Sequence, residues 1–186
     1  GLGSFTVKRD DLLQTLHGGT KVRKLNYLLD QPKYLNAKEW HAVGSIGSGN
    51  LVALARFAQH LGKRLEAHCF WVPITAGITE NLAQLVTDHV NIHYYPNRAA
   101  LVLRQASLFM GGKSRVVIPP GSTSANGMMG IARAGVELSE QIRAGLCPKP
   151  DRIYVPLGSG GTAAGLAVGL ALGGTDTTVC AVAVVE

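Results

Sequence analysis

The sequence predicts an α/β protein with two open, mostly parallel sheets that carry helices on both faces. Apolar runs of strand length alternate with segments of helical periodicity along nearly the whole chain. Strands and helices that alternate in this way form parallel sheets with right-handed crossovers. Of the 186 residues, 46% are hydrophobic and 16% are charged, which supplies enough apolar material for a packed core.

Seven apolar runs have the length and composition of strands. The last run is apolar at every position from 179 to 185, which is typical of a strand buried on both faces of a parallel sheet. Because few other strands lie in the same part of the chain, we expect further sheet or helix material after Glu186, or a partner's surface, to cover it. The expected strands are residues 5–9, 41–44, 65–72, 92–95, 116–118, 153–157 and 178–185.

Apolar stripes at helical spacing lie between most of these strands. One helix should open at Lys21, because Leu25, Leu28 and Leu29 then fall on one face. In the long helix that ends near residue 144, the prolines at 148 and 150 oppose continuation. The other expected helices are residues 50–61, 80–88, 98–110, 125–144 and 162–172.

The order of these elements predicts two domains. Four strands between residues 41 and 118 alternate with helices as a compact unit, so we expect a small α/β domain at residues 41–126. Residues 1–40 and 127–186 should form a larger cofactor-binding domain. This second domain is therefore expected to be discontinuous and incomplete.

Composition argues against several classes of protein. No apolar run is long enough to span a bilayer, and the first residues lack the pattern of a secretion signal. Cys69, Cys147 and Cys180 are odd in number and lack metal-type spacing, which favours free thiols. The net charge is +6, but the basic residues are scattered. We expect a cytoplasmic protein without a metal site and without a nucleic-acid or membrane partner.

A glycine-rich turn, Gly158-Ser159-Gly160-Gly161-Thr162, joins an expected strand to an expected helix. Glycines in this context let backbone N–H groups converge on an anion at the helix N-terminus, so we expect a phosphate site. The turn is not a Walker A loop, because no Lys-Ser or Lys-Thr pair follows it. The alternative is a tight turn whose glycines serve close packing alone.

The same turn also fits a loose dinucleotide fingerprint. Gly158, Gly160 and Ala163 have the required spacing, and Glu186 ends the next strand, where a ribose-binding acid is found. A lone βαβ unit leaves the rest of such a domain missing. A dinucleotide-binding module, or a remnant without catalysis, is the alternative hypothesis.

Lys21 follows two glycines and opens a helix, so its amine feels the positive end of the helix dipole. That field favours the neutral amine that forms a Schiff base, although a solvated surface lysine is the alternative. An amine of this kind and a phosphate-binding turn are together what pyridoxal phosphate requires.

A third motif, Gly47-Ser48-Gly49-Asn50, lies between a strand and a helix. Ser48 can donate a hydrogen bond to a substrate carboxylate, and the Asn50 amide can reach a phenolate oxygen on a cofactor ring. The alternative is that Ser48 or Asn50 caps the helix.

Four blocks of the sequence carry a family resemblance. In their order and spacing they resemble the 1-aminocyclopropane-1-carboxylate deaminase and D-cysteine desulfhydrase family, which has the tryptophan-synthase-β-like fold type II. The family extends beyond both ends of this chain, so the chain resembles one truncated at both ends. The blocks are VKRDDL at 7–12 with GGTKVRKL at 18–25, GSIGSGN at 44–50, VIPPGS at 117–122 and GSGGTAAGLAVGL at 158–170.

The resemblance implies pyridoxal phosphate as cofactor and a role for each motif. Lys21 corresponds to the Schiff-base lysine and, with Ser48, to the catalytic groups. The substrate loop is implied to comprise Ser48, Gly49 and Asn50, with Asn50 also near the cofactor ring. The implied phosphate cradle consists of Gly158, Ser159, Gly160, Gly161 and Thr162.

The resemblance also implies a lyase or deaminase acting on a small amino acid. The reaction is either β-elimination of D-cysteine to pyruvate, ammonia and sulfide, or deamination of aminocyclopropane-carboxylate. The family loop usually reads Ser-Asn-His, whereas Ser48-Gly49-Asn50 is closer to the threonine and cysteine synthase branches. Both reactions therefore stay open, and we expect a homodimer.

Overall fold

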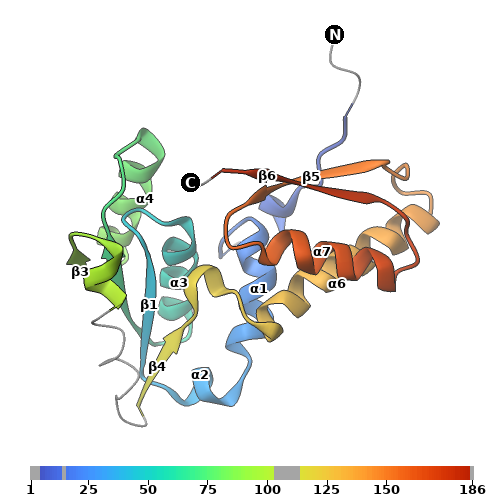
Figure 1. Ribbon diagram of the computed structural model, residues 1–186. Helices are drawn as coiled ribbons and strands as arrows, with labels where there is room; N and C mark the ends of the chain where they lie inside the picture. The colour runs from blue at the N-terminus through green and yellow to red at the C-terminus, as the bar shows by residue number, and fades with distance from the viewer. Residues whose placement is uncertain (1–4, 14–15, 103–113, 185–186) are drawn as a thin grey trace.

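The computed structural model describes residues 5–13, 16–102 and 114–184. Two parallel sheets lie in separate units, with helix α1 (Thr20–Leu29) between them (Figure 1). The first sheet has four strands in the order β3-β2-β1-β4, and the second has two strands, β5 and β6. The predicted α/β class with parallel sheets is therefore confirmed.

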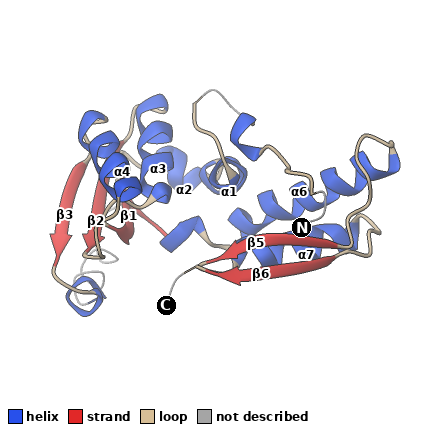
Figure 2. Ribbon diagram, turned by 90° about the horizontal axis from the view of Figure 1, so that it is seen from above, coloured by secondary structure: helices blue, strands red, loops and turns tan. Residues whose placement is uncertain are grey.

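All neighbouring strands of the four-stranded sheet are parallel. Its centre is β1 (Glu39–Ser45), where Ala42 lies opposite Ala67 on one side and Ile118 on the other. Helices α3 and α4 lie on one face of this sheet (Figure 2). The remaining elements of the unit are β2 (Arg64–Phe70), β3 (Asn91–Tyr95), β4 (Arg115–Ile118), α3 (Gly49–His60), α4 (Ala76–Thr87) and the short helix α2 (Pro32–Asn36).

The main hydrophobic core joins this sheet to α1 and α3. Trp40 is fully buried in it, and its indole N–H donates to the Tyr34 carbonyl at 3.0 Å. The apolar face of α1 enters the same core, so this helix from the expected larger domain packs on the small sheet. The division at residues 41 and 126 stays a prediction. The α1 and α3 residues in the core include Val22, Leu25, Leu28, Leu29, Leu51 and Leu54.

The second unit places a short parallel ribbon over two helices. The strands are β5 (Arg152–Leu157) and β6 (Thr178–Ala183), joined by α7 (Gly161–Leu172), and α6 (Ala125–Arg143) lies beside α7. Ile131, Leu166 and Leu170 form a small buried cluster, against which Ile153, Val155 and Val179 pack.

The last strand is covered on one face only among the described residues. Val179 packs against the buried cluster, whereas Val182 and Val184, on the opposite face, are 49% and 59% exposed. The expected cover of this face by further material or by a partner stays a prediction.

The expected strand at residues 5–9 is wrong. These residues have no regular structure and lead into the 3-10 turn η1 (Asp10–Leu12), and Phe5 is 80% exposed. Among the described residues they pair with no strand, so the extended form gains no ladder of hydrogen bonds.

Most of the other predicted elements are confirmed within a few residues. Helix α4 begins at Ala76, four residues earlier than expected, because the Thr75 side chain caps it by accepting from the Ile78 N–H. Residues 98–102 of the expected helix 98–110 are helical, and residues 103–110 lie outside the described part.

Free thiols are confirmed for all three cysteines. Cys69 is buried, which raises the pKa of its thiol to about 11, and Cys147 and Cys180 are partly exposed. Within the described residues, none of the helices has the length and apolar character to cross a membrane.

Helices α6 and α7 lie side by side (Figure 1 and Figure 2), and glycines lie at their contact. A Cβ on Gly135 would lie 2.7 Å from the Leu170 nitrogen, and one on Gly169 would overlap the Ala132 carbonyl group. The contact therefore depends on the absence of side chains at these two positions. It sets the position of the N-terminus of α7 relative to α6.

We expect Gly169→Ala to lower the free energy of unfolding by about 1–3 kcal/mol, since the added methyl group forces the helices apart. Gly77→Ala in α4 is the matched control, because a Cβ there meets no atom within 4 Å. That change should stabilise by up to about 1 kcal/mol through helix propensity. Urea denaturation of both variants measures the difference, and equal effects would contradict the close packing.

Candidate active site

Four chain segments meet between the two units. They are the start of α1, the start of α3, the 3-10 turn η2 (Pro120–Ser122) and the glycine turn before α7. Lys24 and Thr123 connect three of them. The Lys24 ammonium donates to Thr123 Oγ1 at 3.2 Å and lies 3.5 Å from the Gly121 carbonyl oxygen, and Thr123 Oγ1 is 2.8 Å from Ser159 Oγ.

The Lys24 side chain is only 1% exposed and points at the glycine turn. A Cβ on Gly161 would lie 3.0 Å from Lys24 Nζ, so the ammonium occupies the space beside the first residue of α7. Burial, together with the nearby charge of Lys21, lowers the pKa of Lys24 to about 8. A buried ammonium at a helix N-terminus forms, with the backbone N–H groups, a site for an anion.

The glycine turn has the conformation expected of an anion cradle. Gly160 adopts a left-handed conformation with φ 80° at the N-cap of α7 and has no side chain to cap the helix. The first N–H groups of a helix have no partner within it, and here no N-cap side chain supplies one. Gly161 is buried, whereas Gly158 and Ser159 are exposed.

Lys21 lies in the first turn of α1 and is partly buried. Burial lowers the pKa of its amine, which increases the fraction of the neutral form. Lys21 precedes Lys24 by three residues, and residues at this spacing lie on the same face of a helix. The charge effect of Lys21 on Lys24 agrees with this placement.

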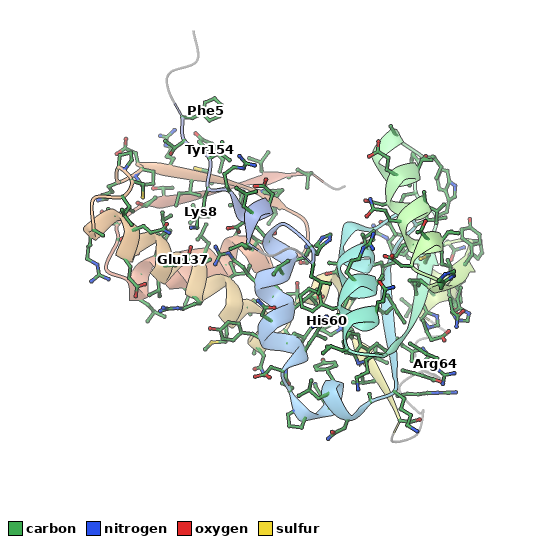
Figure 3. All side chains as sticks on the ribbon, turned by 180° about the vertical axis from the view of Figure 1, so that it is seen from behind. Phe5, Lys8, His60, Arg64, Glu137 and Tyr154 are labelled. Atoms are coloured by element: carbon green, nitrogen blue, oxygen red, sulfur yellow. The ribbon has the colours of Figure 1, made fainter. Side chains whose placement is uncertain are left out.

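An ion cluster holds α1 against α6. Arg23 is 9% exposed and donates to Asp10 at 2.9 Å and to Glu137 at 2.8 Å. Lys8 adds a 2.6 Å ion pair to Glu137, and both residues are labelled in Figure 3. Hydrogen bonds from Arg23, and to a smaller extent from Lys8, lower the pKa of Glu137 to about 2. Since Arg23 lies between Lys21 and Lys24, the cluster fixes the helix that carries both amines.

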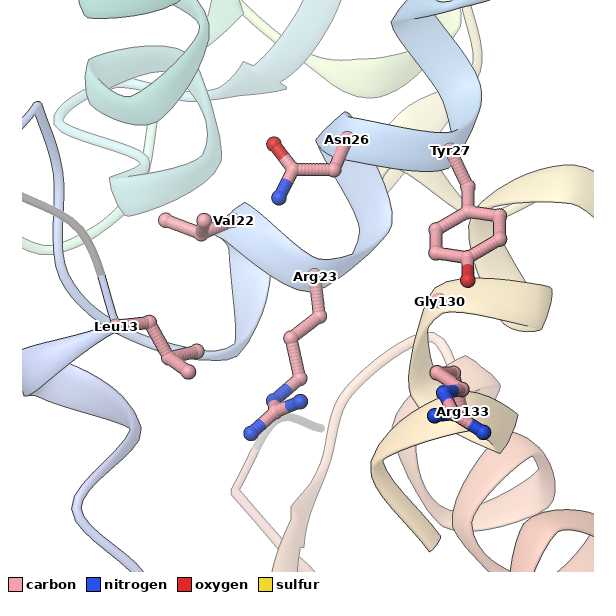
Figure 4. Close-up of a pocket in the computed structure, with 7 residues that line it drawn as sticks. All are labelled: Leu13, Val22, Arg23, Asn26, Tyr27, Gly130 and Arg133. Atoms are coloured by element: carbon pink, nitrogen blue, oxygen red, sulfur yellow. The ribbon is translucent and has the colours of Figure 1, made fainter. Parts of the chain in front are cut away.

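A small pocket lies beside this cluster. Figure 4 shows Arg23 reaching down from α1, with Gly130 and Arg133 on α6 across from it. No larger residue fits at position 130, because a Cβ on Gly130 would overlap the Arg23 carbonyl group. The two helices therefore approach backbone to backbone at this point.

The third predicted motif spans the turn before α3 and the first two residues of that helix. Ser48 occupies the N-cap position of α3, but its side chain makes no capping hydrogen bond. Asn50 is buried, and its Oδ1 accepts from the Ser122 hydroxyl at 2.9 Å. Its Nδ2 is buried without a hydrogen-bond partner among the described residues. The capping alternative is thus not supported for either side chain.

An unpaired buried amide donor costs free energy, so the Asn50 Nδ2 fits a site for an acceptor atom supplied by a ligand. The pyridoxal ring oxygen is such an acceptor, and the Lys24 ammonium with the bare α7 N-terminus fits the phosphate. The residues present therefore suit the predicted cofactor at both of its ends.

Sequence reasoning missed Lys24, Ser122 and Thr123. Lys24 could have been found from its spacing to Lys21, which places both amines on one helical face. The block at 117–122 was noticed for its resemblance but was given no role. The hydrogen bonds of Gly121, Ser122 and Thr123 join residues that lie 72 to 99 positions apart, which local patterns do not reveal.

Comparisons with known proteins identify the family of this chain. A family model described as "Pyridoxal-phosphate dependent enzyme" matches residues 1–186. Nocardicin C-9' epimerase from Nocardia uniformis subsp. tsuyamanensis is 37% identical to this chain, and the match covers 96% of this chain and 56% of the epimerase. The bifunctional D-cysteine desulfhydrase/1-aminocyclopropane-1-carboxylate deaminase of Arabidopsis thaliana is 30% identical to this chain. That match covers 97% of this chain and 48% of the Arabidopsis protein.

Solved structures give the same result. The crystal structure of an ACC deaminase homologue superimposes with a TM-score of 0.76 at 29% identity, over 94% of this chain and 54% of that one. The chain spans about half the length of the curated relatives it matches. These findings confirm the resemblance inferred from the four blocks.

We expect the stability of the protein to fall in acid as the Glu137 carboxylate takes up a proton. Its pKa is depressed from 4.5 to about 2 in the folded state, so its contribution is complete above about pH 4.5 and is lost as the pH falls toward 2. Glu137→Gln should remove about 1 kcal/mol at neutral pH, since water screens the partly exposed carboxylate. It should also flatten the pH dependence in that window.

Urea denaturation between pH 2 and pH 7 measures this effect. Glu140→Gln is the control, because the Glu140 carboxylate is half exposed and lies 3.6 Å from Arg133. An unchanged acid slope in Glu137→Gln would contradict the assignment.

Proposed function

The chain belongs to the pyridoxal-phosphate dependent enzyme family, and on this premise we propose that it binds pyridoxal phosphate between its two units. Lys21 forms the covalent bond to the cofactor, and the turn from Gly158 to Thr162 holds its phosphate. The observation that carries the proposal is the buried Lys24 ammonium, which lies beside Gly161 at the uncapped start of α7.

At the phosphate end, three kinds of donor converge. The Lys24 ammonium lies within hydrogen-bonding distance of the Thr123 hydroxyl, which lies within that distance of the Ser159 hydroxyl. The ammonium also lies beside Gly161, at the start of α7. A phosphate would supply the negative charge that a buried ammonium lacks, and so would raise the pKa of Lys24 again. Binding and the charge state of Lys24 are therefore coupled.

At the ring end, Asn50 and Ser48 take separate roles. The Asn50 Nδ2 would donate to the ring oxygen, because the Asn50 Oδ1 already accepts from Ser122. The Ser48 hydroxyl and the exposed Gly49 backbone lie at the N-terminus of α3, where the helix dipole favours a substrate carboxylate.

When bound, pyridoxal phosphate supplies an aldehyde for the amine and a ring that withdraws electrons from the substrate Cα. The burial of Lys21 favours its neutral amine, which is the nucleophilic form. With a substrate bound, the Lys21 amine would serve as the base that takes the proton from Cα and returns it.

We propose that the protein is a lyase or deaminase that acts on a small amino acid. The relatives named D-cysteine desulfhydrase and 1-aminocyclopropane-1-carboxylate deaminase support this class. Elimination from D-cysteine with uptake of water releases pyruvate, ammonia and sulfide. Deamination of the cyclopropane substrate needs ring opening, for which Ser48 is the candidate proton relay.

Epimerisation is a second candidate, because the relative at 37% identity is named an epimerase. Epimerisation, like elimination from D-cysteine, removes the Cα proton. It differs because a proton then returns to the opposite face of Cα. The pyrophosphate of a dinucleotide would also suit the Lys24 ammonium, but a dinucleotide module leaves the Asn50 Nδ2 without a use. A remnant without a ligand leaves both groups without one. A cytoplasmic location and a homodimer stay predictions.

We expect the protein with pyridoxal phosphate to be yellow and to lose its visible absorbance on borohydride reduction. Lys21→Ala should abolish this band, because the covalent bond cannot form. Lys24→Ala should keep the band but weaken cofactor affinity about 10- to 100-fold through the loss of a charge-assisted hydrogen bond. Lys149→Ala, which changes an exposed lysine, is the control. A colourless wild-type protein that binds NAD would contradict the proposal.

The reaction class is tested with D-cysteine, aminocyclopropane-carboxylate and a panel of chiral amino acids. A lyase or deaminase yields a keto acid and ammonia in equal amounts, and an epimerase changes optical purity without releasing ammonia. We expect keto acid formation in the wild type and a loss of at least about 1000-fold in Lys21→Ala, since the covalent and proton-transfer steps both disappear. Racemisation without ammonia would favour the epimerase.

A further inference from the structure

Ser122 has an uncommon backbone conformation in a fully buried position. Its φ is 55° and its exposed fraction is 0%. His89 is the other non-glycine residue with positive φ among those described. His89 is exposed and follows the C-cap of α4, where left-handed residues commonly end helices. Ser122 ends no α-helix, so its conformation needs another explanation.

The surroundings of Ser122 hold it in this conformation. Its N–H donates to the Pro119 carbonyl at 2.9 Å, and its own carbonyl packs on Gly127, where a Cβ would overlap it. Its hydroxyl donates to Asn50 Oδ1 at 2.9 Å. Strained residues that are fixed from several sides occur preferentially at functional sites.

The turn that contains Ser122 contacts both ends of the proposed cofactor site. Ser122 reaches Asn50, at the ring end, and the next residue, Thr123, reaches Lys24 and Ser159, at the phosphate end. Adjacent residues of one rigid turn therefore fix the two groups of contacts relative to each other.

We infer that Ser122 is a positioning residue that acts on the cofactor through Asn50, an inference that rests on the proposed function. By donating to Oδ1, the Ser122 hydroxyl commits the Asn50 amide to one orientation and leaves Nδ2 as the free donor. A hydrogen bond to the amide oxygen also polarises the amide and strengthens its N–H donor. The left-handed backbone places the hydroxyl where this contact forms.

Two variants separate this role from folding. Ser122→Ala removes the hydroxyl and keeps the strained backbone, whereas Ser122→Gly removes the hydroxyl and relieves the strain. Ser139→Ala is the matched control, because Ser139 is equally buried and donates to a helix carbonyl, Gly135 O, at 3.0 Å. Each variant is made in the wild type and in Asn50→Ala.

Three quantities are measured on the protein in its natural length: the dissociation constant of pyridoxal phosphate, the pH midpoint of its visible absorbance, and the melting temperature without cofactor. Both Ser122 variants should weaken binding about five-fold and raise the pH midpoint, since a ring oxygen with a weaker donor holds a proton more tightly. Ser122→Gly should melt at a higher temperature than Ser122→Ala. Ser139→Ala should change the melting temperature alone.

In the Asn50→Ala background, Ser122→Ala should have no further effect on binding or on the pH midpoint. The inference is overturned if both Ser122 variants bind and titrate like the wild type, or if their effects persist without the Asn50 amide. A wild-type protein that takes up no pyridoxal phosphate overturns the proposed function and this inference with it. Cofactor uptake by the wild type separates the two failures.

Discussion

Helix α1 is packed on both sides, and this double packing fixes where the two amines of the site lie. One face of the helix enters the core of the four-stranded sheet through Leu25 and Leu28. The other face meets α6, where Arg23 bridges to Glu137 and Gly130 allows the backbones to approach. A helix held in this way cannot rotate without breaking one contact or the other. The directions of the side chains at the start of α1 follow from that constraint.

Polar groups buried without full satisfaction lie at the resulting site. The Lys24 ammonium is buried with one hydroxyl and one distant carbonyl as neighbours, and the Asn50 Nδ2 has no partner among the described residues. Such groups destabilise the protein without ligand. They are offset when a ligand brings a phosphate to one and an acceptor oxygen to the other. Stability given up at a binding site is thus recovered on binding.

Local patterns predicted most of the fold and part of the site. The apolar runs found β1 to β6, because runs of apolar residues are typical of strands in parallel sheets. The strand at residues 5–9 was wrong because a strand also needs a neighbour, which its own residues do not encode. The glycine turn and the motif at 47–50 were also recognised, because each is a continuous run of residues. Ser122 and Thr123 were not, since their roles arise from contacts with residues far away in the chain.

The central claim is a division of labour between two lysines on one face of α1: Lys21 bonds to the cofactor aldehyde and Lys24 holds its phosphate. Peptide mass mapping after borohydride fixation of bound pyridoxal phosphate tests this most directly. The account predicts the added mass on Lys21, with Lys24 unmodified. An adduct on Lys24 or on any other lysine, with Lys21 free, would contradict it.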